Sequence, residues 1–286
     1  MERKKAIIYV NLSVFLFGMS GLFAKWLDLP AICITFGRVL FSSIALFIYC
    51  RIAKQSLKIK NSRHLILIII AGVLLALHWC TFMEAIQLST VAIGTITFSA
   101  FPMFVAFIEP VVFKGKLSTK NVIMAFIILI GVTITVPEFS FHNKIAEGIA
   151  LGMVSSLAYA VLTILNKIFS EHYKGTVTAF YEQAVATVVL LPCLLLFDFS
   201  LSLSEFGLLL VLGVFTTAFA HTLFISSLKG ISAQLAGICS SMETVYGIVL
   251  AMLILSEIPT VRECIGAAII IGVVIYSQFS FKSIKE

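Results

Sequence analysis

The sequence predicts an all-α integral membrane protein whose ten transmembrane helices form two inverted five-helix repeats. Three observations predict this fold: an apolar composition, uncharged runs of helix length, and internal similarity at a constant shift. Of the 286 residues, 60% are hydrophobic and 12% are charged, whereas a soluble domain carries about 25% charged residues. This composition excludes a soluble enzyme, a disordered chain and a disulfide-stapled domain.

Ten apolar segments are long enough to span a bilayer, which takes about 20 residues in a helix. Barrel strands would instead alternate in segments of about 10 residues. Residues 65–77 and 123–136 contain no charged side chain at all. The predicted spans are 6–27, 31–50, 64–88, 90–113, 119–137, 148–169, 176–197, 205–227, 232–255 and 262–281. The loops between them leave no room for a water-soluble domain.

The basic residues support this number of spans and orient them. With the N-terminus inside, sixteen Lys and Arg residues fall on the cytoplasmic side and two, Lys144 and Arg262, fall outside. Positive loops stay cytoplasmic, and one span more or fewer would destroy the bias. We therefore expect a multi-pass protein of the plasma membrane (the bacterial inner membrane) with both termini cytoplasmic. The first span is expected to remain as a helix rather than to be cleaved as a signal peptide.

Internal similarity at a shift of about 142 residues divides the chain into two repeats, 1–140 and 141–286. The matched positions are Lys25 with Lys167, His78 with His221, Ser89 with Ser232, Gly94 with Gly237, and Gly131 with Gly272. Because five is an odd number, the second repeat enters the membrane upside down. Inverted repeats are typical of transporters that work by alternating access. A duplication that serves only to build a stable bundle is the alternative.

Several stretches resemble the drug/metabolite transporter superfamily, specifically its EamA-type ten-helix transporters. They are FLFGMSGLFAK at 15–25, FGRVLFSSIAL at 36–46, the long stretch 78–118, AYAVLTILNK at 158–167 and METVYGIVLAMLILSEIPT at 242–260. The stretch FPMFVAFIEPVVFKGK is most similar to the branch that includes aromatic amino-acid exporters. Many members of the family have Glu-Pro where this chain has Glu243-Thr244. The resemblance implies a ten-helix carrier and leaves the substrate open.

Ionisable residues inside the spans are functional candidates because each costs roughly 2.5–3.5 kcal/mol to place in the hydrocarbon. Glu243 lies deep in 232–255 and is expected to bind a substrate ammonium or to carry a proton. The alternative is a protonated carboxyl bonded to a neighbouring helix. Tyr246, three residues on and on the same face, offers a ring and a hydroxyl for stacking.

His78 and His221 occupy matched positions of the third and eighth spans. His78 shares a helix face with Phe82, with Trp79 beside it, and this aromatic wall suits a ring-bearing or ammonium ligand. Arg38, in the second span, could hold a substrate carboxylate in a bidentate fork. The alternatives are helix–helix hydrogen bonds for the histidines, and snorkelling to the interface or pairing with a nearby carboxylate for Arg38. Two histidines without a third ligand make a weak metal site, so we predict no metal.

Pro102 removes a backbone hydrogen bond in the fourth span and should kink it. Together with the matched Gly94 and Gly237 it forms the predicted set of gating or hinge residues. Glu182 and Gln183, about two turns into the seventh span, are assigned either to a cytoplasmic vestibule or to packing.

The sequence carries neither a phosphate-binding loop nor an HExxH motif, so ATP-driven pumping and zinc proteolysis are disfavoured. We expect no enzyme activity and no cofactor, with a proton on Glu243 as the conceivable coupling ion. The prediction is a secondary transporter that moves small metabolites, amino acids or related amphiphilic compounds, in the direction of export. Two alternatives remain: an intramembrane enzyme with His78 and Glu243 as acid and base, and a non-transporting receptor.

The expected partners are the lipid bilayer and a small-molecule substrate. Nucleic acid is not expected, although the net charge is +6, because the basic residues are placed as a membrane protein needs them. A monomer is compatible with the sequence, which leaves the oligomeric state open.

Overall fold

The structure is a computed structural model that describes residues 1–59, 61–135, 144–197 and 200–280. Throughout these ranges the regular structure is helical. The elements are α1 (Arg3–Trp26), α2 (Ala31–Ile52), α3 (Ser62–Leu88), α4 (Val91–Phe98), α5 (Phe101–Val112), α6 (Thr119–Thr135), α7 (Lys144–Ser170), α8 (Gly175–Leu190), η1 (Leu191–Leu196), α9 (Leu203–Gly213), η2 (Val214–Phe219), α10 (Ala220–Ser227), α11 (Ala233–Ser240), α12 (Met242–Ile254) and α13 (Val261–Ser280).

These elements form ten rods that follow the ten predicted spans. Four rods combine consecutive elements: α4 with α5, α8 with η1, α9 with η2 and α10, and α11 with α12. Over the described residues, eight rods are long and apolar enough to cross a membrane, and α6 adds the shorter apolar stretch Val122–Gly131. The remaining rod is α13. The predicted fold class, an all-α membrane protein of two repeats, is confirmed.

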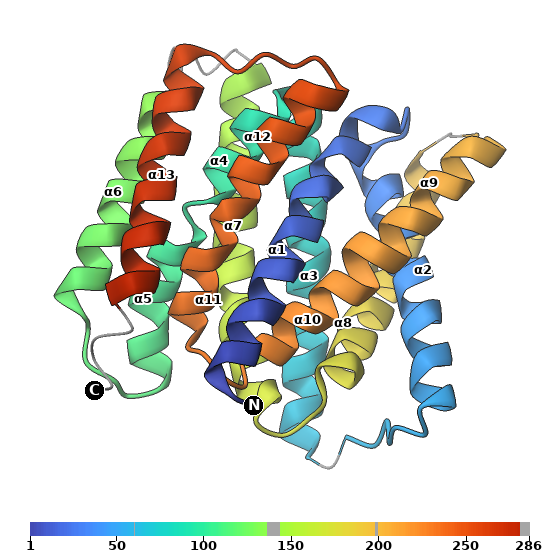
Figure 1. Cartoon of the computed structure of the whole chain (residues 1–286). Coiled ribbons are helices and arrows are strands. Elements are labelled where there is room, and N and C mark those ends of the chain that lie inside the picture. The colour runs from blue at the N-terminus through green and yellow to red at the C-terminus, as the bar shows by residue number, and fades with distance from the viewer. Residues whose placement is uncertain (60, 136–143, 198–199, 281–286) are drawn as a thin grey trace.

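Successive rods run antiparallel, so the two halves of the chain are oppositely oriented (Figure 1). We call the end of the bundle where α1 begins the near end, and the end where α1 finishes the far end. The chain reaches the far end after the five rods of the first half, and α7 starts there and runs toward the near end. The odd number of rods in each half therefore produces the inversion that the sequence predicts.

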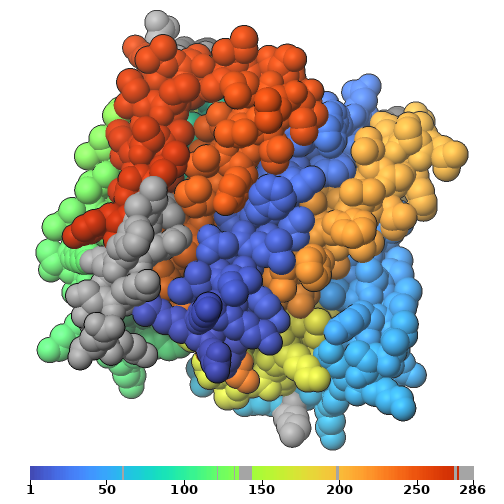
Figure 2. All heavy atoms as spheres, in the orientation of Figure 1, coloured from blue at the N-terminus to red at the C-terminus, as the bar shows by residue number. Residues whose placement is uncertain are grey.

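The two halves pack through one another rather than side by side. The long helix α3 of the first half packs along α7 of the second, and α1 packs against both α10 and α12. Figure 2 shows α1 filling the space between these second-half helices on one face of the molecule. The pair α6 and α13 stands at one edge of the bundle. A site at the centre is consequently built from both repeats.

Three rods are irregular near their middle, and all three irregularities face the centre. The fourth rod stops at Phe98 and restarts at Phe101, with Pro102 in the first turn of α5, where a missing amide hydrogen is tolerated. The corresponding rod of the second half is interrupted at Ser241 without a proline. The third irregularity is η2, one turn of π-helix, a feature that is frequent at functional sites.

Candidate functional site

A small cavity lies where α1, α3, α4, α7 and α12 meet. Its volume is about 10 Å³, close to the space that one water molecule occupies. Its walls are Phe17, Ser20, His78, Trp79, Phe82, Phe98, Tyr159 and Glu243. Three residues predicted for the site from α3, His78, Trp79 and Phe82, thus lie beside Glu243 from the opposite half. The protein is closed around this centre, because no space for a metabolite is present.

His78 has one ring nitrogen anchored and the other unbonded. The Ser155 hydroxyl donates to the His78 carbonyl at 3.0 Å, and the same oxygen lies 2.7 Å from His78 Nδ1. Since the single hydroxyl hydrogen is already committed, Nδ1 donates to Ser155 Oγ, and the neutral ring keeps Nε2 as an acceptor. The ring packs against Tyr159 with centroids 4.5 Å apart and stacks on Phe82 at 5.9 Å.

Arg38 is fully buried and only partly bonded. Its Nε donates to Thr217 Oγ1 at 3.1 Å, and its guanidinium carbon lies 4.0 Å from the centre of the Trp79 ring. Thr217 is placed by the π-helical turn η2, and its hydroxyl donates to the Leu212 carbonyl five residues earlier. Both terminal nitrogens, Nη1 and Nη2, have no hydrogen-bond partner. The bidentate fork that the sequence suggested for Arg38 is therefore unused in this conformation.

Glu243 lies in the first turn of α12, directly after the interruption at Ser241. Its side chain is 5% exposed and borders the cavity. The Arg38 guanidinium acts on it electrostatically, although the two groups form no ion pair within 4.0 Å in the described structure. The centre thus holds a buried guanidinium that packs on Trp79 and a buried carboxyl group that borders the cavity, with no direct bond between them.

His221 is held differently from its matched residue His78. Its Nε2 lies 2.8 Å from Glu182 Oε2, and both side chains are fully buried. Its ring also meets the edge of Trp79 with centroids 5.7 Å apart. Of the two alternatives for Glu182, the structure therefore fits packing in the interior and not an open vestibule. Gln183 is fully buried as well.

Tyr246 and the predicted hinge residues lie outside the cavity wall. The Tyr246 ring packs edge-on against Phe15 of α1, with centroids 5.4 Å apart. Gly94 and Gly237 lie within regular turns of α4 and α11, where a Cβ would collide with Ile86 in the first case and meet Phe101 at 3.1 Å in the second. Both glycines therefore permit close packing, and their role as hinges stays a prediction, as does that of Pro102.

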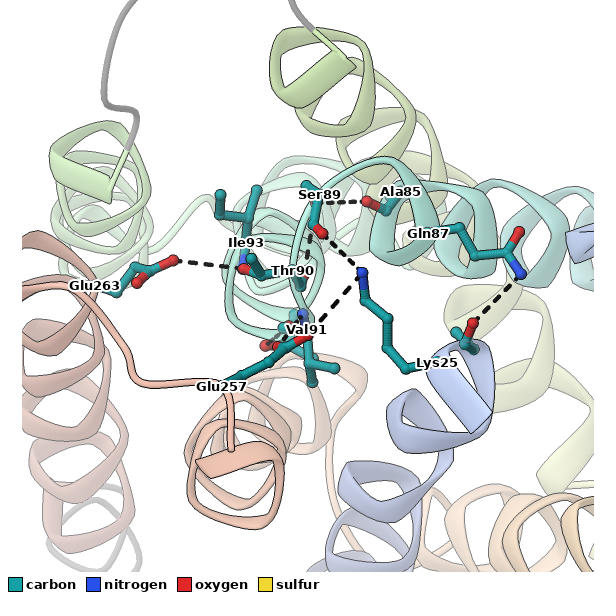
Figure 3. Close-up of polar contacts among 11 residues, drawn as sticks. Lys25, Ala85, Gln87, Ser89, Thr90, Val91, Ile93, Glu257 and Glu263 are labelled. Carbon is teal, nitrogen blue, oxygen red and sulfur yellow. Dashed lines mark hydrogen bonds and ion pairs between the residues drawn. The ribbon is translucent and has the colours of Figure 1, made fainter. Parts of the chain in front are cut away.

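The far end is closed by a polar cluster that we call the far latch (Figure 3), formed by Lys25, Ser89, Val91 and Glu257. Lys25 Nζ donates to the Ser89 carbonyl at 2.8 Å and lies 4.0 Å from Glu257 Oε1. The other carboxylate oxygen of Glu257 accepts from the Val91 amide at 3.1 Å, at the start of α4. A carboxylate at a helix N-terminus is favourable because unpaired amides point toward it.

The near end carries a matching cluster, the near latch, formed by Lys167, Leu228, Ala233, Gln234 and Glu109. Lys167 Nζ donates to the Leu228 carbonyl at 2.6 Å. Glu109 accepts from the amides of Ala233 and Gln234 at the start of α11, each at 3.1 Å. Both latches join a lysine from the first rod of one half to a helix start that is capped by a carboxylate from the other half. With both formed, the centre is closed at both ends.

Sequence reasoning missed three residues of this arrangement. Tyr159 lines the cavity, Ser155 holds His78, and Glu257 caps a helix start. The matched pair Lys25 and Lys167 was a signal for the latches, because an equal shift places both lysines at the same point of each repeat. Nothing comparable marks Tyr159 or Ser155, which look like ordinary polar residues of an apolar helix.

A family model and a solved structure each match both halves of the chain. The model of the EamA-like transporter family matches residues 4–136 and again residues 146–278. A solved crystal structure covers 100% of this chain and of its own, with a TM-score of 0.77 and 15% identity, which shows a shared fold.

Curated relatives of similar length are transporters. An uncharacterized transporter of Bacillus subtilis is 22% identical over 94% of this chain and 88% of its own. A pseudopaline exporter of Pseudomonas aeruginosa is 23% identical over 94% of both chains. An S-adenosylmethionine uptake transporter of Rickettsia prowazekii is 23% identical over 96% of this chain and 93% of its own.

These matches span both halves, and the family and the named relatives are transporters rather than enzymes. The protein is accordingly a multi-pass membrane protein that transports small molecules. It belongs to the EamA-like transporter family, within the drug/metabolite transporter superfamily.

Proposed function

We propose that the protein is a secondary transporter of amino acids or related amphiphilic zwitterions, which bind at the centre between the two halves. The observation that carries the proposal is the buried Arg38, whose two terminal nitrogens have no partner, together with the buried carboxyl group of Glu243 beside an aromatic-lined cavity. A buried charge without a partner is costly, so a ligand that brings the complementary charges would stabilise Arg38 and an ionised Glu243. An amino acid brings a carboxylate for Arg38 and an ammonium for Glu243.

The aromatic wall would receive the apolar part of the substrate. Trp79, Phe82, Phe98 and Tyr159 surround the cavity, and large apolar or aromatic side chains gain most from such a lining. His78 Nε2 and the Tyr159 hydroxyl, which has no partner, would complete the polar contacts. Tyr246, which packs on Phe15, is left out of this site, and His221 reaches it only through the edge of Trp79.

The cavity of about 10 Å³ is far too small for an amino acid, so the substrate enters by expansion of the centre. Opening the far latch while the near latch stays formed would expose the cavity to one side of the membrane, and the reverse would expose it to the other. The excess of basic residues in the loops at the near end supports a cytoplasmic location for that end. The resemblance and the exporter among the relatives support export across a bacterial inner membrane.

A flux assay in proteoliposomes tests this function. A panel of radiolabelled amino acids, with phenylalanine first, is offered to wild type, Glu243→Gln and His78→Ala. We expect exchange of at least one aromatic or large apolar amino acid in wild type and its loss in Glu243→Gln. Glu147→Gln, which alters an exposed carboxylate, is the matched control and should keep wild-type flux. Wild-type rates for Glu243→Gln and His78→Ala with every transported substrate would refute the site.

A further inference from the structure

A second buried ionisable pair, Glu182 on α8 and His221 on α10, lies outside the cavity wall. Both side chains are 0% exposed, and Glu182 Oε2 lies 2.8 Å from His221 Nε2. A carboxylate and an imidazole in this contact share one exchangeable proton. With that proton the pair is neutral overall, and without it the pair carries one negative charge.

The pair has hydrogen-bonding atoms that take no part in the bond between Glu182 and His221. Glu182 Oε1 and His221 Nδ1 both lack a hydrogen-bond partner. Buried polar atoms nearby on the same helices, on Gln183 and Thr222, are also unpartnered. Leaving a buried polar group unpaired costs about 1–3 kcal/mol, and an interior region that keeps several such groups is suited to admit water or protons. A pair that served only to stabilise the fold would need none of these unpaired polar atoms.

Two titratable groups on other helices act on the pair electrostatically: His78 of α3 acts on His221, and Tyr159 of α7 acts on Glu182. Arg38 of α2 and Glu243 of α12 act in turn on His78 and Tyr159. Cys80 of α3 interacts with Arg38. The buried face of α1 and the turn η2 contribute no titratable side chain. A proton gained or lost by Glu182 and His221 therefore changes the charge of a cluster that also contains Arg38 and Glu243.

Water reaches a point close to the pair from the near end. An open pocket of about 730 Å³ there is lined by Gly175 and Thr176 at the start of α8 and by Ile225 and Ser226 of α10. Ser226 is five residues after His221, which is about 8 Å along a helix.

Trp79 connects the pair to the substrate cavity. The Arg38 guanidinium lies 4.0 Å from the ring centre, and the His221 ring approaches at 5.7 Å. A proton on His221 therefore places a second cation beside Trp79 and next to Arg38, which changes the field on a residue that lines the cavity. Proton occupancy at the pair and substrate occupancy at the cavity are in this way energetically linked.

We propose that Glu182 and His221 together bind the coupling proton of the transport cycle, at a site distinct from Glu243 and the substrate cavity. The proton passes from water in the near-end pocket to the imidazole–carboxylate pair, whose charge changes from minus one to zero, and it is returned to water later in the cycle. The coupling rests on the proposed transport function, whereas proton binding does not.

The chain provides its own optical reporter for proton binding. It has two tryptophans, Trp26 and Trp79, so Trp26→Phe leaves Trp79 as the single fluorophore beside His221. In this parent we expect Trp79 emission to fall in one step as the pH is lowered, because a protonated imidazole quenches indole. The step should vanish in His221→Gln, and its midpoint should shift in Glu182→Gln and Glu182→Asp, because the imidazole stays while its carboxylate partner is removed or moved. The matched control His78→Gln, which alters the other histidine near Trp79, should keep it.

An absent step in the parent, a step that persists in His221→Gln, or an unchanged midpoint in Glu182→Gln would overturn the proton site. If either of these variants fails to fold, an unchanged midpoint in Glu182→Asp has the same force.

A transport measurement with radiolabelled phenylalanine tests the coupling. Wild-type proteoliposomes should accumulate phenylalanine against its own concentration gradient when a pH difference is imposed. The accumulation should be at least tenfold lower in Glu182→Gln. Exchange at equal pH should stay within threefold of wild type in the variant. Undiminished accumulation in Glu182→Gln would disprove the coupling. If wild type exchanges no phenylalanine, the proposed substrate fails, and the fluorescence titration still decides the proton site.

Discussion

The two ends of the molecule are chemically alike, whereas the two halves of its centre are not. At each end a lysine binds the carbonyl that closes a helix, and a carboxylate caps the start of the next helix: Lys25 and Glu257 at the far end, Lys167 and Glu109 at the near end. In the centre, Arg38 and Glu182 each lie seven residues after the first residue of their helices, α2 and α8. There the same point of the repeat carries opposite charges.

The histidines show the same contrast. His78 and His221 are matched in sequence, but a serine hydroxyl holds the first and a carboxylate holds the second. Duplication gives both halves the same backbone path, and side chains then diverge where their tasks differ. The two ends perform one task, closure, and stay alike. The proposed substrate has two different ends, a carboxylate and an ammonium, which two identical half-sites could not distinguish.

The largest effect is expected from removing the cation of the centre. Arg38→Met deletes the proposed partner of the substrate carboxylate, and hydrogen bonds to charged groups are worth about 1.5–3 kcal/mol. Flux of phenylalanine at low concentration should fall by roughly 10- to 150-fold. Arg38→Lys keeps the charge without the fork and should lie between Arg38→Met and wild type. Equal flux in Arg38→Met and wild type would remove Arg38 from the site.

The next effect tests whether the ends are equivalent. Glu257→Gln and Glu109→Gln each remove a charge from a helix start, which is worth about 1 kcal/mol, or roughly a fivefold shift between conformations. We expect the shifts to be opposite in direction. The measurement is the labelling rate of Ser20→Cys, which lines the cavity, by an impermeant thiol reagent added from either side, in a chain without its native cysteines. Shifts in the same direction would contradict two matched latches.

A smaller effect concerns how the first half anchors its histidine. Ser155→Ala removes the hydroxyl that bonds His78 Nδ1 and the His78 carbonyl. The free energy of unfolding, measured by thermal unfolding in detergent, should therefore fall by about 1 kcal/mol. The matched control is the next residue on the same helix. Ser156 is also buried, but its hydroxyl has no partner, so Ser156→Ala should cost nothing. Equal losses in the two variants would mean that the Ser155 bond contributes no stability.

The smallest effect separates two tyrosines. Tyr246→Phe removes a hydroxyl on the side of α12 that packs against Phe15, and phenylalanine flux should stay within about twofold of wild type. Tyr159→Phe removes a hydroxyl from the cavity wall, and flux should fall further than in Tyr246→Phe. The reverse order of the two variants would restore Tyr246 to the site in place of Tyr159.

The fold was predictable because a bilayer allows few solutions. A spanning segment has to bond its own backbone, so it must be a continuous apolar helix, and such runs are visible in the sequence from Leu65 to Leu77 onward. The ionisable residues within them identify the centre for a related reason. Arg38, His78 and Glu243 are costly in lipid, so such residues are rare in spanning segments and stand out in the sequence.

The direction in which each side chain points from its helix was not predictable. The helices are apolar on every side, because one side meets lipid and the other meets protein, so no polar stripe shows which way Tyr246 or Glu182 points. The partners of Glu109 and Glu257 are backbone amides of distant helices, and a backbone amide leaves no mark in a sequence. The break at Ser241 also lacked a signal, since this chain has Thr244 where many family members have proline.

That difference makes the two interrupted rods unequal. Pro102 has no amide hydrogen to offer the Phe98 carbonyl, so the first interruption is permanent. Thr244 keeps its amide, which now bonds the Ser241 carbonyl at 3.3 Å, while its hydroxyl reaches across to the Thr95 carbonyl at 2.9 Å. In a regular helix the Thr244 amide would bond the Ser240 carbonyl, an option that Pro102 lacks in the first interrupted rod. The interruption before Glu243 is therefore not fixed by the covalent structure of the chain, whereas the interruption before Pro102 is.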